Sequence, residues 1–124
     1  MCSQSSILII EDDGLIAMYI AETLEKAGYS VLKPEYSGEK AINHIETSPL
    51  PDLILMDIGL GGKLNGIETA KHILKQCAIP IIFLSAYSNQ NQINEALSIS
   101  PYGYILKPFI EDDLLAAISH ALCQ

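Results

Sequence analysis

Short apolar runs alternate along the chain with segments in which apolar residues recur every three or four positions. The runs occupy residues 7–10, 31–32, 53–56, 79–84 and 104–106. The stronger runs are continuous in apolar residues, a pattern typical of strands that are covered on both faces of a parallel sheet. They predict five strands, of which the second and fifth are the weakest.

Helical periodicity fills the intervals between these runs. In the first interval Ile16, Ile20 and Leu24 recur at steps of four, and Gly28 follows as the expected C-terminal cap. The other expected helices lie near residues 41–45, 67–77, 91–98 and 114–122. The last of them follows the acidic run 111–113, which suits the positive end of a helix dipole.

Strand and helix alternate five times, which predicts an α/β fold. We expect a (βα)5 unit whose doubly wound, five-stranded parallel sheet lies between two helical layers, as a three-layer sandwich. A chain of 124 residues with 49% hydrophobic residues suits one domain, 1–124, with its core at about 6–122. In open sheets of this kind ligands bind at the carboxyl ends of the strands, near the point where strand order reverses.

The net charge of the chain argues against nucleic acid as a direct partner. The sequence has fifteen acidic residues, seven lysines and no arginine, which gives a net charge of −8. An acidic surface repels the phosphate backbone, and it lacks the arginine that pairs with phosphates and guanine edges. The chain has no long apolar stretch and no signal-peptide pattern, so neither membrane insertion nor export is expected. Cys2, Cys77 and Cys123 are odd in number and far apart, which favours reduced thiols in a cytoplasmic protein.

Chemically active side chains follow four of the apolar runs. They are the acids 11–13 after the first run, then Asp57, Ser85 and Lys107 after the third, fourth and fifth. Singly, each has a structural explanation, such as a helix cap at Asp13 or a lysine that extends to solvent. Together they place several carboxylates at one edge of the sheet, where they repel unless a cation or protons neutralise them.

A hard divalent ion, magnesium or manganese, suits these oxygen ligands, because magnesium takes one or two carboxylates and keeps several waters. Such an ion beside Lys107 forms a receptor for a phosphoryl group. Asp57 is then the candidate nucleophile and acyl-phosphate former. Ser85 and Lys107 are expected to bind the other phosphoryl oxygens.

Five pieces of sequence carry a family resemblance. They are residues 7–13 (ILIIEDD), 53–58 (LILMDI), 65–68 (NGIE), 83–87 (FLSAY) and 103–109 (GYILKPF). In this order and at these separations, over about residues 6–122, the chain resembles the receiver domain of two-component response regulators. The resemblance implies a flavodoxin-like strand order, 2-1-3-4-5.

The resemblance also implies a metal site and a phosphoacceptor. Asp57 matches the phosphoacceptor of the family. Asp12 and Asp57 match the carboxylates that contact magnesium, Glu11 the acid that acts through water, and Gly59 the residue that supplies a backbone carbonyl. Asp13 lies beyond this set and is assigned to helix capping.

Other family positions concern the conformational change that follows phosphorylation. Ser85 matches the hydroxyl that turns toward the phosphoryl group, and Tyr104 matches the aromatic residue that then swings inward. Lys107 matches the lysine of the family motif, and its peptide bond to Pro108 is expected to be cis. The glycine-rich loop 58–65 is about one residue longer than usual in the family, and we expect it to be mobile.

By resemblance, the chain accepts a phosphoryl group from a sensor histidine kinase or a histidine phosphotransfer domain. It signals through the face built from its fourth helix, fifth strand and fifth helix to a downstream protein target or an attached output domain, with homodimerisation left open. The fourth helix follows a polar run and has only Ile93, Ala96 and Leu97 as expected anchors, which makes it a candidate moving part.

Three other interpretations stay open. In the first, the chain is not a single-domain receiver but a receiver excised from a longer hybrid kinase or regulator. A phosphohydrolase with an aspartyl nucleophile is less favoured, since Gly59 stands where the common signature has a second aspartate. A flavin or nucleotide site is disfavoured by the acids 11–13, because phosphate binding there needs backbone amides without adjacent anions.

Overall fold

Strands and helices alternate through the whole of the computed structural model, which describes residues 5–86 and 89–123. The elements are β1 (Ser6–Ile10), α1 (Gly14–Lys26), β2 (Ser30–Val31), α2 (Gly38–Thr47), β3 (Leu53–Asp57), α3 (Gly66–Leu74), β4 (Ile81–Ser85), α4 (Gln90–Ile99), β5 (Tyr104–Leu106) and α5 (Glu111–Leu122). The predicted α/β fold is confirmed.

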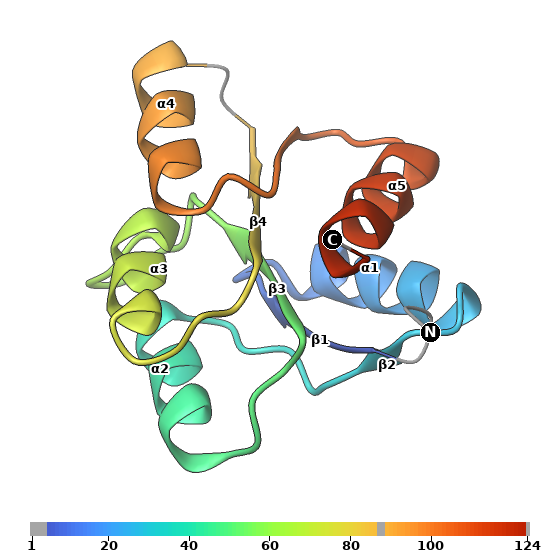
Figure 1. The fold of residues 1–124 in the computed structure, drawn as a ribbon, viewed down its shortest axis with the longest axis horizontal. Helices are drawn as coiled ribbons and strands as arrows, with labels where there is room; N and C mark the ends of the chain where they lie inside the picture. Colours follow the sequence, from blue (N-terminus) through green and yellow to red (C-terminus); the bar gives the residue numbers. More distant parts are fainter. Residues whose placement is uncertain (1–4, 87–88, 124) are drawn as a thin grey trace.

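The five strands form one parallel sheet in the order β2-β1-β3-β4-β5, as the resemblance implied. The chain first winds from β1 to one edge and then returns past β1 to build the other half. Consequently α1 and α5 cover one face of the sheet, while α2, α3 and α4 cover the other (Figure 1). The reversal of strand order lies between β1 and β3, so their carboxyl ends flank the expected ligand crevice.

The core consists of two apolar layers, one on each face of the sheet. Side chains of a strand point alternately to opposite faces. Leu8 and Ile10 of β1 accordingly join the layer under α2, α3 and α4, while Ile7 and Ile9 join the layer under α1 and α5. Every residue of β3 and β4 is buried. Burial on both faces explains why these runs are continuous in apolar residues.

Side-chain caps fix where helices begin beside the carboxyl ends of the strands. Asp13 Oδ1 accepts hydrogen bonds from the backbone N–H groups of Leu15 and Ile16 at 3.0 and 3.3 Å, which confirms Asp13 as the cap of α1. Asn89 caps α4 by accepting a hydrogen bond from the backbone N–H of Gln92. Gly28, with φ of 97°, follows the end of α1 as predicted.

The fourth helix is anchored thinly. Ala96 is its one buried side chain, Ile93 and Leu97 are half-buried, and Ile99, which the sequence did not suggest, packs against the core. Few apolar contacts therefore oppose a displacement of α4.

The cysteine prediction is only partly right. Cys77 is a free, half-buried thiol, but Cys123 is disulfide-bonded, so the expectation of reduced cysteines is wrong for that residue. The part of the chain that the structure describes has no helix of the length and apolarity needed to cross a membrane.

Candidate functional site

The carboxyl ends of four adjacent strands bring the predicted side chains to one edge of the sheet. Glu11 directly follows β1, Asp57 and Ser85 end β3 and β4, and Lys107 directly follows β5. The register of the parallel strands sets how far each side chain lies along the sheet. Asp57 of β3 pairs with Leu84 of β4, so Ser85 lies one residue further along. Strand order and register therefore place these four side chains at one edge of the sheet.

Three carboxylates come together to form the acidic pocket. One oxygen from each of Glu11, Asp12 and Asp57 lies within 4.8 Å of the others. Glu11 and Asp57 are buried, with 1% and 4% of their surface exposed, whereas Asp12 is exposed. Two acids thus lie in the protein interior, and the third is open to ligands from solvent.

Lys107 is the cation of the pocket. Its Nζ donates a hydrogen bond to Glu11 Oε1 at 2.7 Å and lies 3.3 Å from Asp57 Oδ1. The peptide bond between Lys107 and Pro108 is cis, as the resemblance implied. One ammonium thus serves two buried carboxylates, and a third carboxylate lies beside them, so the pocket keeps an excess of negative charge.

This excess charge changes the proton affinity of the buried groups. Burial raises the pKa of Glu11 from its ordinary value of 4.5 to about 7; the neighbouring Asp57 adds to the rise, and Lys107 opposes it. Burial would lower the pKa of Lys107, but its hydrogen bond to Glu11 and the charge of Asp57 outweigh that effect and raise it. The arrangement suits a divalent cation, which can replace a proton as the neutralising charge.

The glycine-rich loop after β3 directs backbone groups at two of the acids. The N–H of Gly59 donates to Asp57 Oδ1 at 3.1 Å, and the N–H of Gly61 donates to Asp12 Oδ2 at 3.2 Å. The second bond crosses 49 positions of sequence and was not predicted. Charge-assisted bonds of this kind orient carboxylate ligands.

Gly66 explains one piece of the sequence pattern that had no assigned role. A Cβ at this position would overlap the backbone carbonyl oxygen of Asp57 and crowd Ile58. The N–H of Gly66 also donates to the carbonyl of Ile58 at 3.0 Å. Only glycine lets α3 begin directly against the strand end that carries Asp57.

Ser85 and Tyr104 are linked by a residue that sequence reasoning missed. The side-chain amide of Gln92, in the first turn of α4, donates to Ser85 Oγ at 3.2 Å and to Tyr104 Oη at 2.9 Å. Ser85 is buried and Tyr104 half-buried. The only available signal was position: a long amide in the first turn of a helix that begins shortly after β4 can reach back over the strand end. Tyr87, the last residue of the segment 83–87 that carries part of the resemblance, lies outside the described residues.

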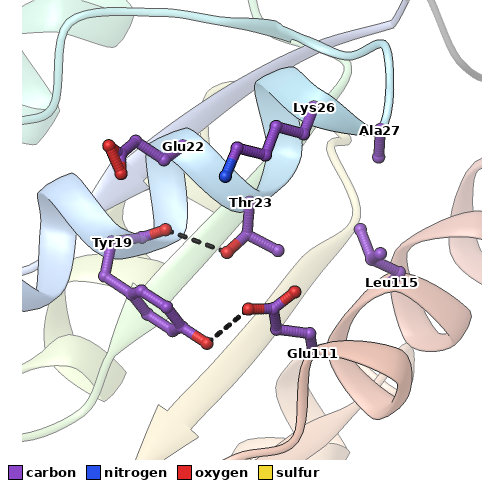
Figure 2. Close-up of a pocket in the computed structure, with 7 residues that line it drawn as sticks. All are labelled: Tyr19, Glu22, Thr23, Lys26, Ala27, Glu111 and Leu115. Carbon is purple, nitrogen blue, oxygen red and sulfur yellow. Dashed lines mark hydrogen bonds between the residues drawn. The ribbon is translucent and has the colours of Figure 1, made fainter.

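A separate hollow of about 210 Å³ lies between α1 and α5, away from the acidic pocket. Figure 2 shows the hydroxyl of Tyr19 directed at Glu111, to whose Oε2 it donates at 2.7 Å. The Tyr19 ring also contacts Phe109, with 6.0 Å between ring centroids. These contacts tie α1 to the segment that follows Lys107, so they support the site without forming part of it.

Comparison with known proteins gives a consistent result over nearly the whole chain. The family model described as the response regulator receiver domain matches residues 7–119. The uncharacterized transcriptional regulatory protein YrkP of Bacillus subtilis (strain 168) is 38% identical over 112 residues, which are 90% of this chain and 47% of that protein. The transcriptional regulatory protein PdtaR of Mycobacterium tuberculosis (strain H37Rv) is 34% identical over 118 residues, 95% of this chain and 57% of that protein.

Solved structures agree with the family match. The receiver domain of the sensor histidine kinase PA1611 from Pseudomonas aeruginosa PAO1, with a magnesium ion in its active site cleft, aligns with a TM-score of 0.86 and 27% identity. The alignment covers 98% of this chain and 99% of that one. The chain spans about half the length of the curated relatives it matches.

Proposed function

The chain belongs to the response regulator receiver domain family, whose members are signalling phosphoacceptors and not turnover enzymes, and on that premise we propose that Asp57 accepts a phosphoryl group in a two-component phosphorelay. One observation carries the proposal. Asp57 is buried at the carboxyl end of β3, with Oδ1 3.3 Å from Lys107 Nζ and with Glu11 and Asp12 beside it. A nucleophile, a cation and spare carboxylate ligands meet within one pocket.

A magnesium or manganese ion is part of the proposal. Asp12 and Asp57 would hold it directly, Glu11 through water, and Gly59 through its backbone carbonyl. The all-oxygen donor set and the raised pKa of Glu11 support this choice, since both indicate a cation deficit. When bound, the ion neutralises charge on the phosphoryl oxygens.

The chemical step is a transfer from nitrogen to oxygen. A carboxylate oxygen of Asp57 attacks phosphorus of a phosphohistidine, the phosphorus–nitrogen bond breaks, and its electron pair stays on the imidazole. The transition state is loose and spreads negative charge over the equatorial phosphoryl oxygens. The protein must therefore place Asp57 in line with the breaking bond and neutralise the charge on those oxygens. Lys107, held beside Asp57 by Glu11, provides a fixed positive charge.

The phosphodonor is a sensor histidine kinase or a histidine phosphotransfer domain. After transfer the Ser85 hydroxyl turns to a phosphoryl oxygen and Tyr104 moves inward, which shifts the face formed by α4, β5 and α5. A downstream protein target or an attached output domain responds to that face. A cytoplasmic location without direct contact with nucleic acid or membrane completes the proposal.

The chain spans only about half the length of its curated relatives. The proposal therefore includes both an output domain on the same polypeptide and a separate target protein. The phosphohydrolase alternative gains no support, since no observation of the pocket favours release of phosphate over retention.

Labelling with a small phosphodonor such as acetyl phosphate tests the proposed function. We expect acid-labile incorporation that requires magnesium and is lost in Asp57→Asn. Asp112→Asn, which changes an exposed acid in the first turn of α5, is the matched control and should label like the original protein. Label retained in Asp57→Asn would place phosphoryl acceptance on another residue.

A further inference from the structure

The side chain of Gln92 donates hydrogen bonds to both proposed switch residues, Ser85 and Tyr104. Its Nε2 lies 3.2 Å from Ser85 Oγ and 2.9 Å from Tyr104 Oη, and it comes from α4, whereas the two hydroxyls come from β4 and β5. An amide nitrogen carries two hydrogens, so it can donate to both hydroxyl oxygens at once. Three elements thus meet at one amide.

These two bonds hold the hydroxyls toward α4. Under the proposed function Ser85 turns toward Asp57 to reach a phosphoryl oxygen, and this turn takes its hydroxyl away from Gln92. Tyr104 is half-buried against the core layer under α4, and its bond to the same amide ties the position of its hydroxyl to that of Ser85. The bond to Ser85 therefore belongs to the resting arrangement and weighs against the activated one.

The surroundings of Gln92 allow it to release both partners. An open hollow of about 480 Å³ lies on the outer side of this residue, lined by Asn65, Ile67, Asn89, Asn91, Gln92 and Glu95. Gln92 itself is only half-buried, and Ala96 is the one fully buried side chain of α4. The side chain can turn into the hollow without displacing core atoms.

We propose that Gln92 is a positioning residue that holds Ser85 and Tyr104 in the resting arrangement and couples their release to movement of α4. The proposal rests on the proposed function, since it needs a phosphoryl group at Asp57. By linkage, an interaction made only in the resting state lowers the affinity of the protein for whatever stabilises the activated state. Loss of the Gln92 amide should therefore raise that affinity.

The test measures binding of beryllofluoride, a mimic of the phosphoryl group, in the presence of magnesium. Gln92→Met keeps a side chain of similar length and removes the amide. We expect roughly fivefold tighter binding, the factor that one net hydrogen bond supplies. Gln90→Met is the matched control, because Gln90 is in the same turn but donates to Asn94, and its affinity should equal that of the original protein.

A second readout separates positioning from general loosening of the helix. Fluorine NMR of 3-fluorotyrosine-labelled protein, with Tyr104 assigned from Tyr104→Phe, should show the Tyr104 signal of Gln92→Met shifted part of the way toward its beryllofluoride-bound position. Gln92→Ala, which favours helix formation, should give the same two changes if the Met variant folds poorly.

Equal or weaker beryllofluoride binding by folded Gln92→Met and Gln92→Ala, with an unshifted Tyr104 signal, would overturn the role of Gln92 and leave the proposed function intact. Failure of the original protein to bind beryllofluoride with magnesium would instead remove the proposed function, and the inference with it.

Discussion

The buried carboxyl of Glu11 makes the stability of the protein depend on pH in a predictable direction. Its pKa is about 7 in the folded protein and 4.5 as its ordinary value, which the unfolded chain should approach. Below pH 4.5 Glu11 is protonated in both states. Between pH 4.5 and 7 the folded state alone holds the proton, so stability falls as pH rises, and above about pH 7 the decline stops.

The size of the effect follows from the same shift. One pKa unit corresponds to about 1.4 kcal/mol, so the full rise from 4.5 to about 7 sets an upper limit of roughly 3 to 4 kcal/mol on the loss of stability. Magnesium should recover much of that loss above pH 7, because it binds the folded pocket and supplies the missing positive charge. The raised pKa of Lys107 does not enter this window, since that group is protonated throughout it.

Urea unfolding at several pH values between 4.5 and 8, with a chelator present, measures the effect. Glu11→Gln keeps the shape of the side chain and removes its titration, so the difference between the two curves isolates Glu11 from the other acids. Glu25→Gln, at an exposed position of α1, is the control and should run parallel to the original protein. Parallel curves for Glu11→Gln and the original protein would refute the reasoning.

Three further variants test how the pocket is built. Gly66→Ala should lower the free energy of unfolding by about 2 kcal/mol or more, because the added Cβ overlaps the Asp57 carbonyl, as urea unfolding would show. Gly61→Pro should weaken magnesium binding several-fold in calorimetry by removing the N–H that orients Asp12, whereas Gly61→Ala should not. Lys107→Ala should slow phosphoryl labelling by at least about tenfold while magnesium still binds, since Lys107 acts on the phosphoryl oxygens.

Each of these three expectations can be contradicted by a specific result. Gly14→Ala, at a position with open space around its Cβ, is the control for Gly66, and equal effects of the two changes would mean that the close approach is unimportant. Equal magnesium affinities of the two Gly61 variants would remove the role of that N–H. Unchanged labelling in Lys107→Ala would show that another group neutralises the phosphoryl oxygens.

The sequence allowed the fold to be predicted because its signals are local or follow from topology. Continuous apolar runs such as 53–56 reflect burial on both faces of β3, and Asp57 is at the strand end that parallel topology brings beside Glu11. Given the strand order, the convergence of the site followed without any knowledge of side-chain geometry.

The remaining features depend on long-range placement of single side chains. The amide of Gln92 reaches Tyr104 only because α4 is packed beside β5, and the N–H of Gly61 reaches Asp12 only because the loop after β3 folds back. The pKa of Glu11 reflects the extent of its burial, which no spacing reveals. Periodicity carries no information about any of these three.

Chemical location of the acyl phosphate tests the central claim most directly. Borohydride reduces an aspartyl phosphate to homoserine, and trypsin would release the peptide between Lys40 and Lys63, which contains both Asp52 and Asp57. Fragmentation of that peptide after phosphorylation should place homoserine at position 57, and only when magnesium was present. Homoserine at position 52, at any other site, or formed equally with a chelator would contradict the account.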